Sequence, residues 1–167
     1  MASGRNFQPL GDHHDCTSFS CGIDALDNYF RERATQDIKR RISNCFVACD
    51  GQGKVVAYYT LAATSLPLTE LSDLEKKKLP RYALLPAALI GRLAVDINHR
   101  NMGLGGAMII DAALRVSRSD PAIYALIVDA KDASAAGFYE HLGFRGFASR
   151  ALTLFIPLDS VMKAIAR

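Results

Sequence analysis

Apolar side chains recur every fourth residue through segment 24–42, and this spacing predicts one amphipathic helix. Two runs rich in β-forming residues follow, at 45–49 and 55–63. Between them lies Asp50-Gly51-Gln52-Gly53, a turn sequence suited to a hairpin. The apolar positions of the predicted helix are Leu26, Phe30, Ala34, Ile38 and Ile42. The first third of the chain therefore predicts a helix followed by a β-hairpin.

The rest of the chain alternates apolar strands with helical patterns. Pro67, Pro80 and Pro86 punctuate a stretch that we expect to be an excursion over the surface, with one short polar helix at 70–78 and a role in substrate specificity. Strands are expected at 88–95 and 123–128, helices at 107–116 and 133–142, and a final strand pair at 144–147 and 151–156. This order predicts an α/β (α+β mixed) fold with a mixed sheet.

The composition is that of an ordinary globular protein. With 167 residues, 50% of them apolar and 22% charged, the chain fits one domain over residues 1–167. No apolar run approaches the roughly 20 residues that span a bilayer, and the first ten residues contain no secretory signal. We therefore expect a cytoplasmic protein without a membrane partner. The four cysteines lack the spacing of a zinc site, so we expect free thiols and no metal.

Residues 100–106 form a glycine-rich turn between a predicted strand and a predicted helix. Gly103, Gly105 and Gly106 remove side chains where a ligand must approach the backbone, and the free amides of a helix N-terminus attract anions. No Gly-Lys-Ser/Thr ending is present, which argues against a P-loop, and Met108 stands where a Rossmann turn needs its third glycine. From these residues alone, a plain strand-to-helix loop stays open beside an anion site.

Two motifs together resemble one known family. The pattern Arg100-x-x-Gly103-x-Gly105-Gly106 resembles the Arg/Gln-x-x-Gly-x-Gly/Ala signature of the GNAT acetyltransferases. Segment 132–144 resembles that family's second cofactor motif, Asn-x-x-Ala-x-x-Phe-Tyr-x-x-x-Gly-Phe, with Asp132 in place of asparagine. The resemblance covers about residues 40–158. It implies a single GNAT-like domain with a central mixed, mostly antiparallel sheet flanked by helices. It also implies acetyl-CoA as the acetyl donor and CoA as the product.

The same resemblance implies the residues that hold the donor. Backbone groups around Leu93 and Val95 hold the acetyl and pantetheine portions, and one of their N–H groups serves the oxyanion. The amides of 100–106 hold the pyrophosphate. The implied cofactor-binding residues are Leu93, Ala94, Val95, Arg100, Asn101, Met102, Gly103, Leu104, Gly105, Gly106, Asp132, Ala135 and Phe138.

Tyr139 is the candidate general acid. Its hydroxyl, with an ordinary pKa of about 10, can protonate a departing thiolate of similar basicity. The alternative is that Tyr139 only packs on the cofactor. No general base stands out, although His99 and His141 are possible bases. This absence favours an α-amine acceptor, because such an amine has a pKa near 8 and is already partly neutral.

Five further segments extend the resemblance over about residues 10–158. They are Phe19-x-Cys21-Gly22, Leu26-Asp27-x-Tyr29-Phe30, Val56-Ala57-Tyr58-Tyr59-Thr60-Leu61, Gly91-Arg92-Leu93-Ala94-Val95-Asp96 and Val128-Asp129-Ala130-Lys131-Asp132. With them the whole chain resembles the GNAT toxins of bacterial type II toxin–antitoxin pairs, which acetylate the amino group of aminoacyl-tRNA and block translation. This narrower resemblance implies a ribbon-helix-helix antitoxin as partner and a homodimer.

Basic residues are the candidate tRNA contacts, because Lys and Arg on the phosphate backbone supply most of the affinity of such complexes. Arg92 projects from the strand implied to carry the acetyl group, so it either touches the acceptor end of tRNA or forms an internal ion pair. The alternative for the basic runs is that they are solvated surfaces without a ligand. The candidate substrate-binding residues are Arg92, Arg33, Lys39, Arg40 and Lys77.

Two rival functions remain at this point. One is an ordinary GNAT enzyme that acetylates a small amine or a protein N-terminus. The other is a catalytically silent CoA-binding module that acts through protein contacts. Tyr139 argues against the silent module, because a module without catalysis has no need of an acid.

Overall fold

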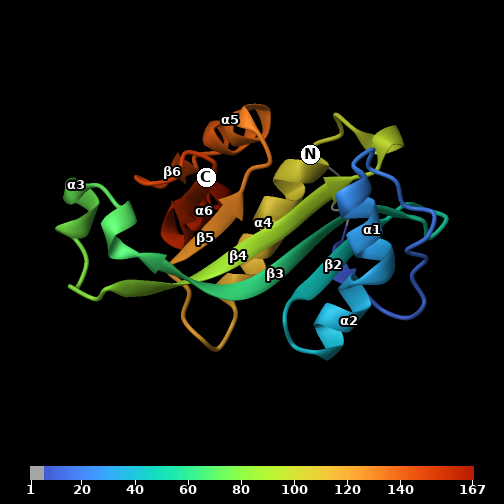
Figure 1. The fold of residues 1–167 in the computed structure, drawn as a ribbon, viewed down its shortest axis with the longest axis horizontal. Helices are drawn as coiled ribbons and strands as arrows, with labels where there is room; N and C mark the ends of the chain where they lie inside the picture. Colours follow the sequence, from blue (N-terminus) through green and yellow to red (C-terminus); the bar gives the residue numbers. More distant parts are fainter. Residues whose placement is uncertain (1–5) are drawn as a thin grey trace. The chain divides into compact units, whose positions relative to one another are not determined.

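The computed structural model describes residues 6–167 and contains a mixed sheet with helices, as the sequence predicts. The strand order is β1-β2-β3-β4-β5-β7-β6. Figure 1 labels β2 to β6 among these strands. The strands are β1 (Gln8–Pro9), β2 (Asn44–Cys49), β3 (Val55–Pro67), β4 (Leu84–Val95), β5 (Ala125–Asp129), β6 (Arg145–Gly146) and β7 (Thr153–Pro157). The helices are α1 (Asp24–Glu32), α2 (Ala34–Lys39), α3 (Asp73–Lys76), α4 (Leu104–Ser117), α5 (Ala133–His141) and α6 (Leu158–Ile165), with short 3-10 helices η1 (Leu68–Glu70) and η2 (Ile97–His99).

The described chain divides into two compact units. The first runs to Ala62 and includes Gly91–Asp111, and the second contains Ala63–Ile90 and Ala112–Arg167. Strands β3 and β4 each contribute residues to both units. The single domain expected over residues 1–167 stays a prediction, and its first five residues lie outside the described part of the chain.

In the first unit, the helix predicted over 24–42 is two helices. The break lies at Arg33, whose φ of −122° and ψ of −27° depart from helical values. Arg41 then adopts a left-handed φ of 59°, which ends the second helix. The predicted apolar stripe therefore stops at Ile38, and Ile42 is 63% exposed. The predicted hairpin is present, since β2 and β3 pair antiparallel.

Aromatic rings hold α1 against β3. The rings of Phe30 and Tyr58 stack with centroids 4.4 Å apart, and Phe19 meets both edge-on. The Tyr58 hydroxyl donates to the carbonyl of Leu26 at 2.6 Å. A hydrogen-bonded phenol can be fully buried without the penalty of an unpaired polar group, and this bond fixes α1 over the strand.

In the second unit, β4 pairs parallel with β5, and β5 pairs antiparallel with β7. A buried cluster that includes Leu66, Leu85, Ile127 and Phe155 fills this unit. The excursion predicted at 67–86 contains η1 and α3, which are shorter than the helix expected at 70–78.

Two carboxylates tie the excursion to β6 and to the connection that follows it in the same unit. Glu70 accepts from the amide and hydroxyl of Ser149, at 2.9 and 2.6 Å. Glu75 forms an ion pair with Arg145 at 2.8 Å. The excursion is thus a fixed part of the second unit's surface.

Helix α6 and strand β1 are missing from the sequence prediction, which ended at Pro157. That proline is the N-cap residue of α6, with a φ of −58° that suits the start of a helix. The amide of Leu158 donates to the backbone carbonyl of Tyr124 at 2.8 Å. Val161 is buried where α6 packs on β5 and β7. A proline after an apolar strand therefore begins a helix here.

Candidate functional site

The glycine-rich turn follows β4 and η2 in the first unit. Asn101 and Gly103 both adopt left-handed backbone, with φ of 63° and 75°. Glycine enters this region freely and asparagine tolerates it, so the two residue types suit the turn. The carbonyl of Gly103 accepts from the amide of Ala107 at 3.1 Å, which starts α4. The turn therefore delivers the chain directly into a helix N-terminus.

The first amides of α4 fit a pyrophosphate. Those of Leu104, Gly105 and Gly106 have no acceptor within the helix, and the helix dipole adds positive potential at this end. The side chain of Leu104 is 4% exposed and anchors the first turn. A Cβ at Gly106 would meet no atom within 4 Å. Packing within the described chain does not require a glycine at that position, whereas close approach of a ligand to the backbone does.

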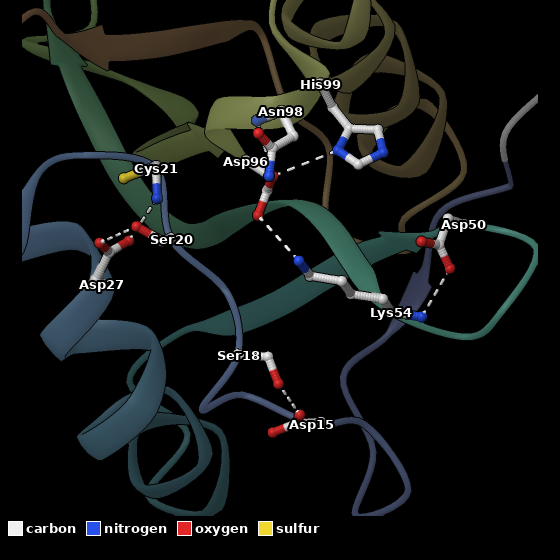
Figure 2. A network of polar contacts seen from close by, with 10 residues as sticks. All are labelled: Asp15, Ser18, Ser20, Cys21, Asp27, Asp50, Lys54, Asp96, Asn98 and His99. Carbon is white, nitrogen blue, oxygen red and sulfur yellow. Dashed lines mark hydrogen bonds and ion pairs between the residues drawn. The ribbon is translucent and has the colours of Figure 1, made fainter.

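A buried carboxylate holds the segment before the turn (Figure 2). Asp96, which is 1% exposed, accepts from the amide of Asn98 at 2.9 Å and lies 3.4 Å from His99 Nδ1 and 3.8 Å from Lys54 Nζ. Burial alone would raise the pKa of Asp96, but the hydrogen bonds from Asn98 and His99 and the charge of Lys54 leave it below its ordinary value. The imidazole of His99, considered above as a general base, is turned toward this carboxylate.

The side chains of β4 alternate about the sheet. Ala94 is buried in the cluster with Phe30 and Tyr58. Leu93 and Val95 are half-buried and, by the alternation of a strand, point to the opposite face. The predicted role of their backbone groups toward the acetyl donor stays a prediction.

Arg92 contacts an aromatic ring instead of an acid. Its guanidinium carbon lies 3.5 Å from the centroid of the Tyr29 ring, a close cation–π contact. The hydroxyl of Tyr29 donates to Asp37 at 2.7 Å. Within residues 6–167 Arg92 makes no ion pair, so the internal ion pair considered above is wrong for this part of the chain. Contact with the acceptor end of tRNA stays a prediction.

Tyr139 lies in the second unit, on α5. Its side chain is 8% exposed, between the rings of Phe138 and Phe144 at centroid distances of 5.2 and 5.5 Å. Burial raises the pKa of Tyr139 to about 12. Its hydroxyl finds no hydrogen-bond partner among residues 6–167. A buried hydroxyl without a partner is unusual in a folded protein and marks a position where a ligand atom would complete the bonding.

Asp132, the departure from the family motif, has a clear local role. It is the N-cap of α5, and its Oδ1 accepts from the amide of Ala135 at 2.8 Å. Aspartate and asparagine cap a helix about equally well, which accounts for the substitution. Phe138 is 41% exposed and Ala135 half-buried. Their contacts with a cofactor stay predictions.

The predicted basic contacts are exposed but do not share one helix. Lys39 belongs to α2, Arg33 lies at the break before it, Arg40 follows it, and Lys77 follows α3 in the second unit. Arg33, Lys39 and Arg40 therefore do not lie on the single helix predicted over 24–42, because the chain breaks at Arg33. None of the four forms an ion pair with another described residue.

The roles of two residues of the first unit do not follow from the sequence motifs. Asp96 stands in the sequence only as the last residue of one motif, and no motif contains Lys54. The available signal was a lone carboxylate closing the apolar strand 88–95, next to the glycine turn. Within residues 6–167 the four cysteines are free, no three His, Cys, Asp or Glu residues gather into a possible metal site, and no helix is long and apolar enough to cross a membrane.

Comparisons with known proteins show the family and the fold of the chain. A family model described as an acetyltransferase (GNAT) domain matches residues 41–146. The tRNA-acetylating toxin of Mycobacterium tuberculosis is 35% identical over 137 residues, which is 81% of each chain. The solved structure of AtaT complexed with acetyl-methionyl-tRNAfMet superposes with a TM-score of 0.86 at 27% identity, covering 96% of this chain and 98% of that chain. AtaTR bound with AcCoA gives a TM-score of 0.80 at 26% identity, covering 96% and 97%.

Proposed function

Because this chain belongs to the GNAT acetyltransferase family, and is thus an acetyl-CoA-dependent N-acetyltransferase, we propose that it acetylates the α-amino group of aminoacyl-tRNA and blocks translation as a toxin. Two relatives support the choice of acceptor. One is named a tRNA-acetylating toxin, and the other was solved with an acetylated methionyl-tRNA. Both matches extend over most of the chain.

The observation that carries the proposed chemistry is the buried hydroxyl of Tyr139, which has no hydrogen-bond partner among residues 6–167. With its pKa raised to about 12 by burial, this phenol stays protonated at physiological pH. It therefore holds a proton at Oη for the sulfur that leaves the acetyl group. A structural tyrosine in the same apolar surroundings gains nothing from a hydroxyl that makes no bond.

Acetyl-CoA supplies an activated thioester, and the chain supplies the groups that bind and orient it. We assign the pyrophosphate to the amides of 100–106, the acetyl and pantetheine portions to the backbone of 93–95, and the second motif's contacts to Asp132, Ala135 and Phe138. An α-amine needs no strong base, which fits a chain whose His99 faces Asp96.

The acceptor surface and partners complete the proposal. Arg33, Lys39, Arg40 and Lys77 are exposed cations without internal ion pairs among the described residues, so they are available to tRNA phosphates. A toxin of this kind acts in the cytoplasm, forms a homodimer and is held inactive by a ribbon-helix-helix antitoxin. We expect a short gene that encodes a ribbon-helix-helix protein beside the gene for this chain.

The decisive experiment offers one radiolabelled acetyl-CoA pool to four acceptors: charged tRNA, uncharged tRNA, a polyamine and a peptide. We expect label on charged tRNA only, released by mild alkali as the N-acetyl amino acid. Label on the polyamine or peptide but not on charged tRNA would contradict the acceptor and leave an ordinary GNAT enzyme. Absence of transfer to any acceptor, with intact acetyl-CoA binding, would support the silent module instead.

A further inference from the structure

Two sequence motifs that look unrelated meet in the first unit. One is the Phe19-x-Cys21-Gly22 segment before α1, which has no role in the chemistry above. The other is Arg100, the first residue of the cofactor turn. The Arg100 guanidinium donates from Nη2 to the carbonyl of Cys21 at 2.8 Å, although the two residues are 79 positions apart in the chain.

The segment before α1 is itself fixed from both sides. The amide of Ile97, just before the turn, donates to the carbonyl of Ser20 at 2.9 Å. From the other side, Asp27 of α1 accepts from the amide of Cys21 at 2.9 Å and lies 3.4 Å from the Ser20 hydroxyl (Figure 2). Arg100 therefore reaches a rigid carbonyl that is anchored to a helix.

Gly22 makes this reach possible. It adopts a left-handed φ of 86°, and a Cβ added there would lie 2.9 Å from Arg100 Nη2 and 3.4 Å from Ile97. The first distance is shorter than side chains tolerate, so any other residue would displace the guanidinium. The left-handed backbone thus favours glycine at this position, and the absence of a Cβ leaves the guanidinium in place.

We infer that Arg100 is a positioning residue, whose bond to the Cys21 carbonyl sets the conformation of the cofactor turn, and that Gly22 keeps the space for that bond. The turn contains two left-handed residues, Asn101 and Gly103, and such backbone persists only where its surroundings hold it. Preorganised amides bind an anion more tightly than mobile ones. The inference rests on the proposed assignment of acetyl-CoA to this turn. The rival role for Arg100 is direct contact with a phosphate of the donor.

The test is a double-mutant cycle on acetyl-CoA affinity, measured by calorimetry on the full chain, with variants Arg100→Met, Gly22→Ala and both together. We expect each single variant to weaken binding about ten-fold, the size of one lost hydrogen bond to a charged group. The double variant should bind acetyl-CoA with about the affinity of the single variant that binds more weakly. The two losses do not add, because both substitutions remove the same contact. The rate at saturating acetyl-CoA should stay within about two-fold of wild type, so that the effect lies in KM.

Two matched controls separate strain and charge from positioning. Gly53→Ala places the same substitution at a φ of 84° with no atom within 4 Å of the new Cβ. Arg118→Met removes an exposed arginine after the end of α4. Both should bind acetyl-CoA like wild type. If Gly22→Ala does not fold, Gly22→Asn replaces it, because asparagine tolerates left-handed backbone and still adds the clashing Cβ.

Two outcomes would overturn the inference. One is a loss with Arg100→Met and none with Gly22→Ala, which indicates direct contact with phosphate. The other is two full, additive losses. Gly106→Val keeps this failure distinct from failure of the proposed site. If Gly106→Val binds acetyl-CoA with wild-type affinity, the turn is not the cofactor site. If Gly106→Val loses affinity while Arg100→Met and Gly22→Ala keep it, the turn is the cofactor site and only the positioning role is refuted.

Discussion

The cofactor turn at 100–106 and helix α5 contain the family's two cofactor motifs, but the two motifs offer different kinds of groups to a ligand. The turn is largely exposed and offers backbone amides, shaped by the left-handed Asn101 and Gly103. Helix α5 offers the side-chain hydroxyl of Tyr139, which is buried between aromatic rings and has no partner among residues 6–167. We expect the turn to act through the shape of its backbone and α5 to act through this buried hydroxyl.

This contrast separates affinity from chemistry. Amides of a helix N-terminus are present whatever the side chains are, so substitutions in the turn act through geometry and alter binding. A lone hydroxyl is removed completely by one substitution, so a change there alters the chemical step. The predictions that follow test this division, beginning with the variant that should have the largest effect.

Tyr139→Phe should lower kcat by about 10² to 10⁴-fold, the range for loss of a general acid, and leave the dissociation constant of acetyl-CoA nearly unchanged. The ring and its contacts with Phe138 and Phe144 remain, so the fold should persist. Single-turnover kinetics and calorimetry measure the two quantities. Tyr124→Phe, a half-buried tyrosine of the same unit, is the matched control and should keep full activity. Wild-type turnover in Tyr139→Phe would mean that this tyrosine only packs on the cofactor.

The pH profile should show a rising limb and no falling limb up to pH 10. The rise follows deprotonation of the α-amine, with a pKa near 8, and amounts to about fifty-fold in kcat/KM between pH 6 and 8. Tyr139 must stay protonated to act as an acid, and its pKa of about 12 keeps it so throughout this range. Initial rates, corrected for spontaneous deacylation of the tRNA ester, give the profile. A fall with an apparent pKa below 10 would show that burial does not protect the hydroxyl.

The raised pKa of Tyr139 also makes the stability of the fold depend on pH in the alkaline range. The group is raised in the folded state, above the value of about 10 expected when unfolded. Its contribution to stability is therefore fully present below pH 10 and declines as the pH rises toward 12. Tyr139→Phe should remove that part of the alkaline loss of stability, which urea unfolding at pH 9 and pH 11 can measure.

The sequence predicted features that have a local cause. Gly103 is needed by its own φ, and Asp132 caps its own helix, so residue type alone announces both. The break at Arg33 was missed because Ala34 and Ile38 of α2 continue the four-residue spacing of α1. Periodicity records which face is buried and does not register a change of helix axis.

Contacts between residues far apart in the chain could not be predicted from the sequence, for a different reason. The bond between Arg100 and Cys21 spans 79 residues, and the contact of Arg92 with Tyr29 joins β4 to α1. Charge at Arg92 suggested either a phosphate or an acid as its partner, and an aromatic ring satisfies the same cation without an opposite charge. Which of these partners is present depends on tertiary packing, which no local pattern reveals.

Gly106→Ala tests the shape of the turn without removing any group. A Cβ there meets no protein atom within 4 Å, and alanine in a helix is about 1 kcal/mol more favourable than glycine. The variant should therefore be more stable to urea yet bind acetyl-CoA about ten-fold more weakly, since the methyl group blocks close approach to the amides. Gly137→Ala, the same change in α5 with equally open surroundings, should gain stability and keep its affinity. Equal affinities in the two variants would mean that the helix end is not approached closely.

The smallest effect separates Asp132's local role from a role toward the cofactor. Asp132→Ala removes the N-cap of α5 and should cost about 1 kcal/mol of stability, whereas Asp132→Asn keeps an oxygen acceptor and should cost a few tenths. Urea unfolding measures both, and acetyl-CoA affinity is measured on the same samples. If capping is the whole role, affinity in Asp132→Asn stays at the wild-type value and Asp132→Ala loses little beyond its stability. A stable Asp132→Asn that binds acetyl-CoA markedly more tightly would show instead that the carboxylate repels the phosphates, and that the family's usual asparagine serves the cofactor as well as the helix.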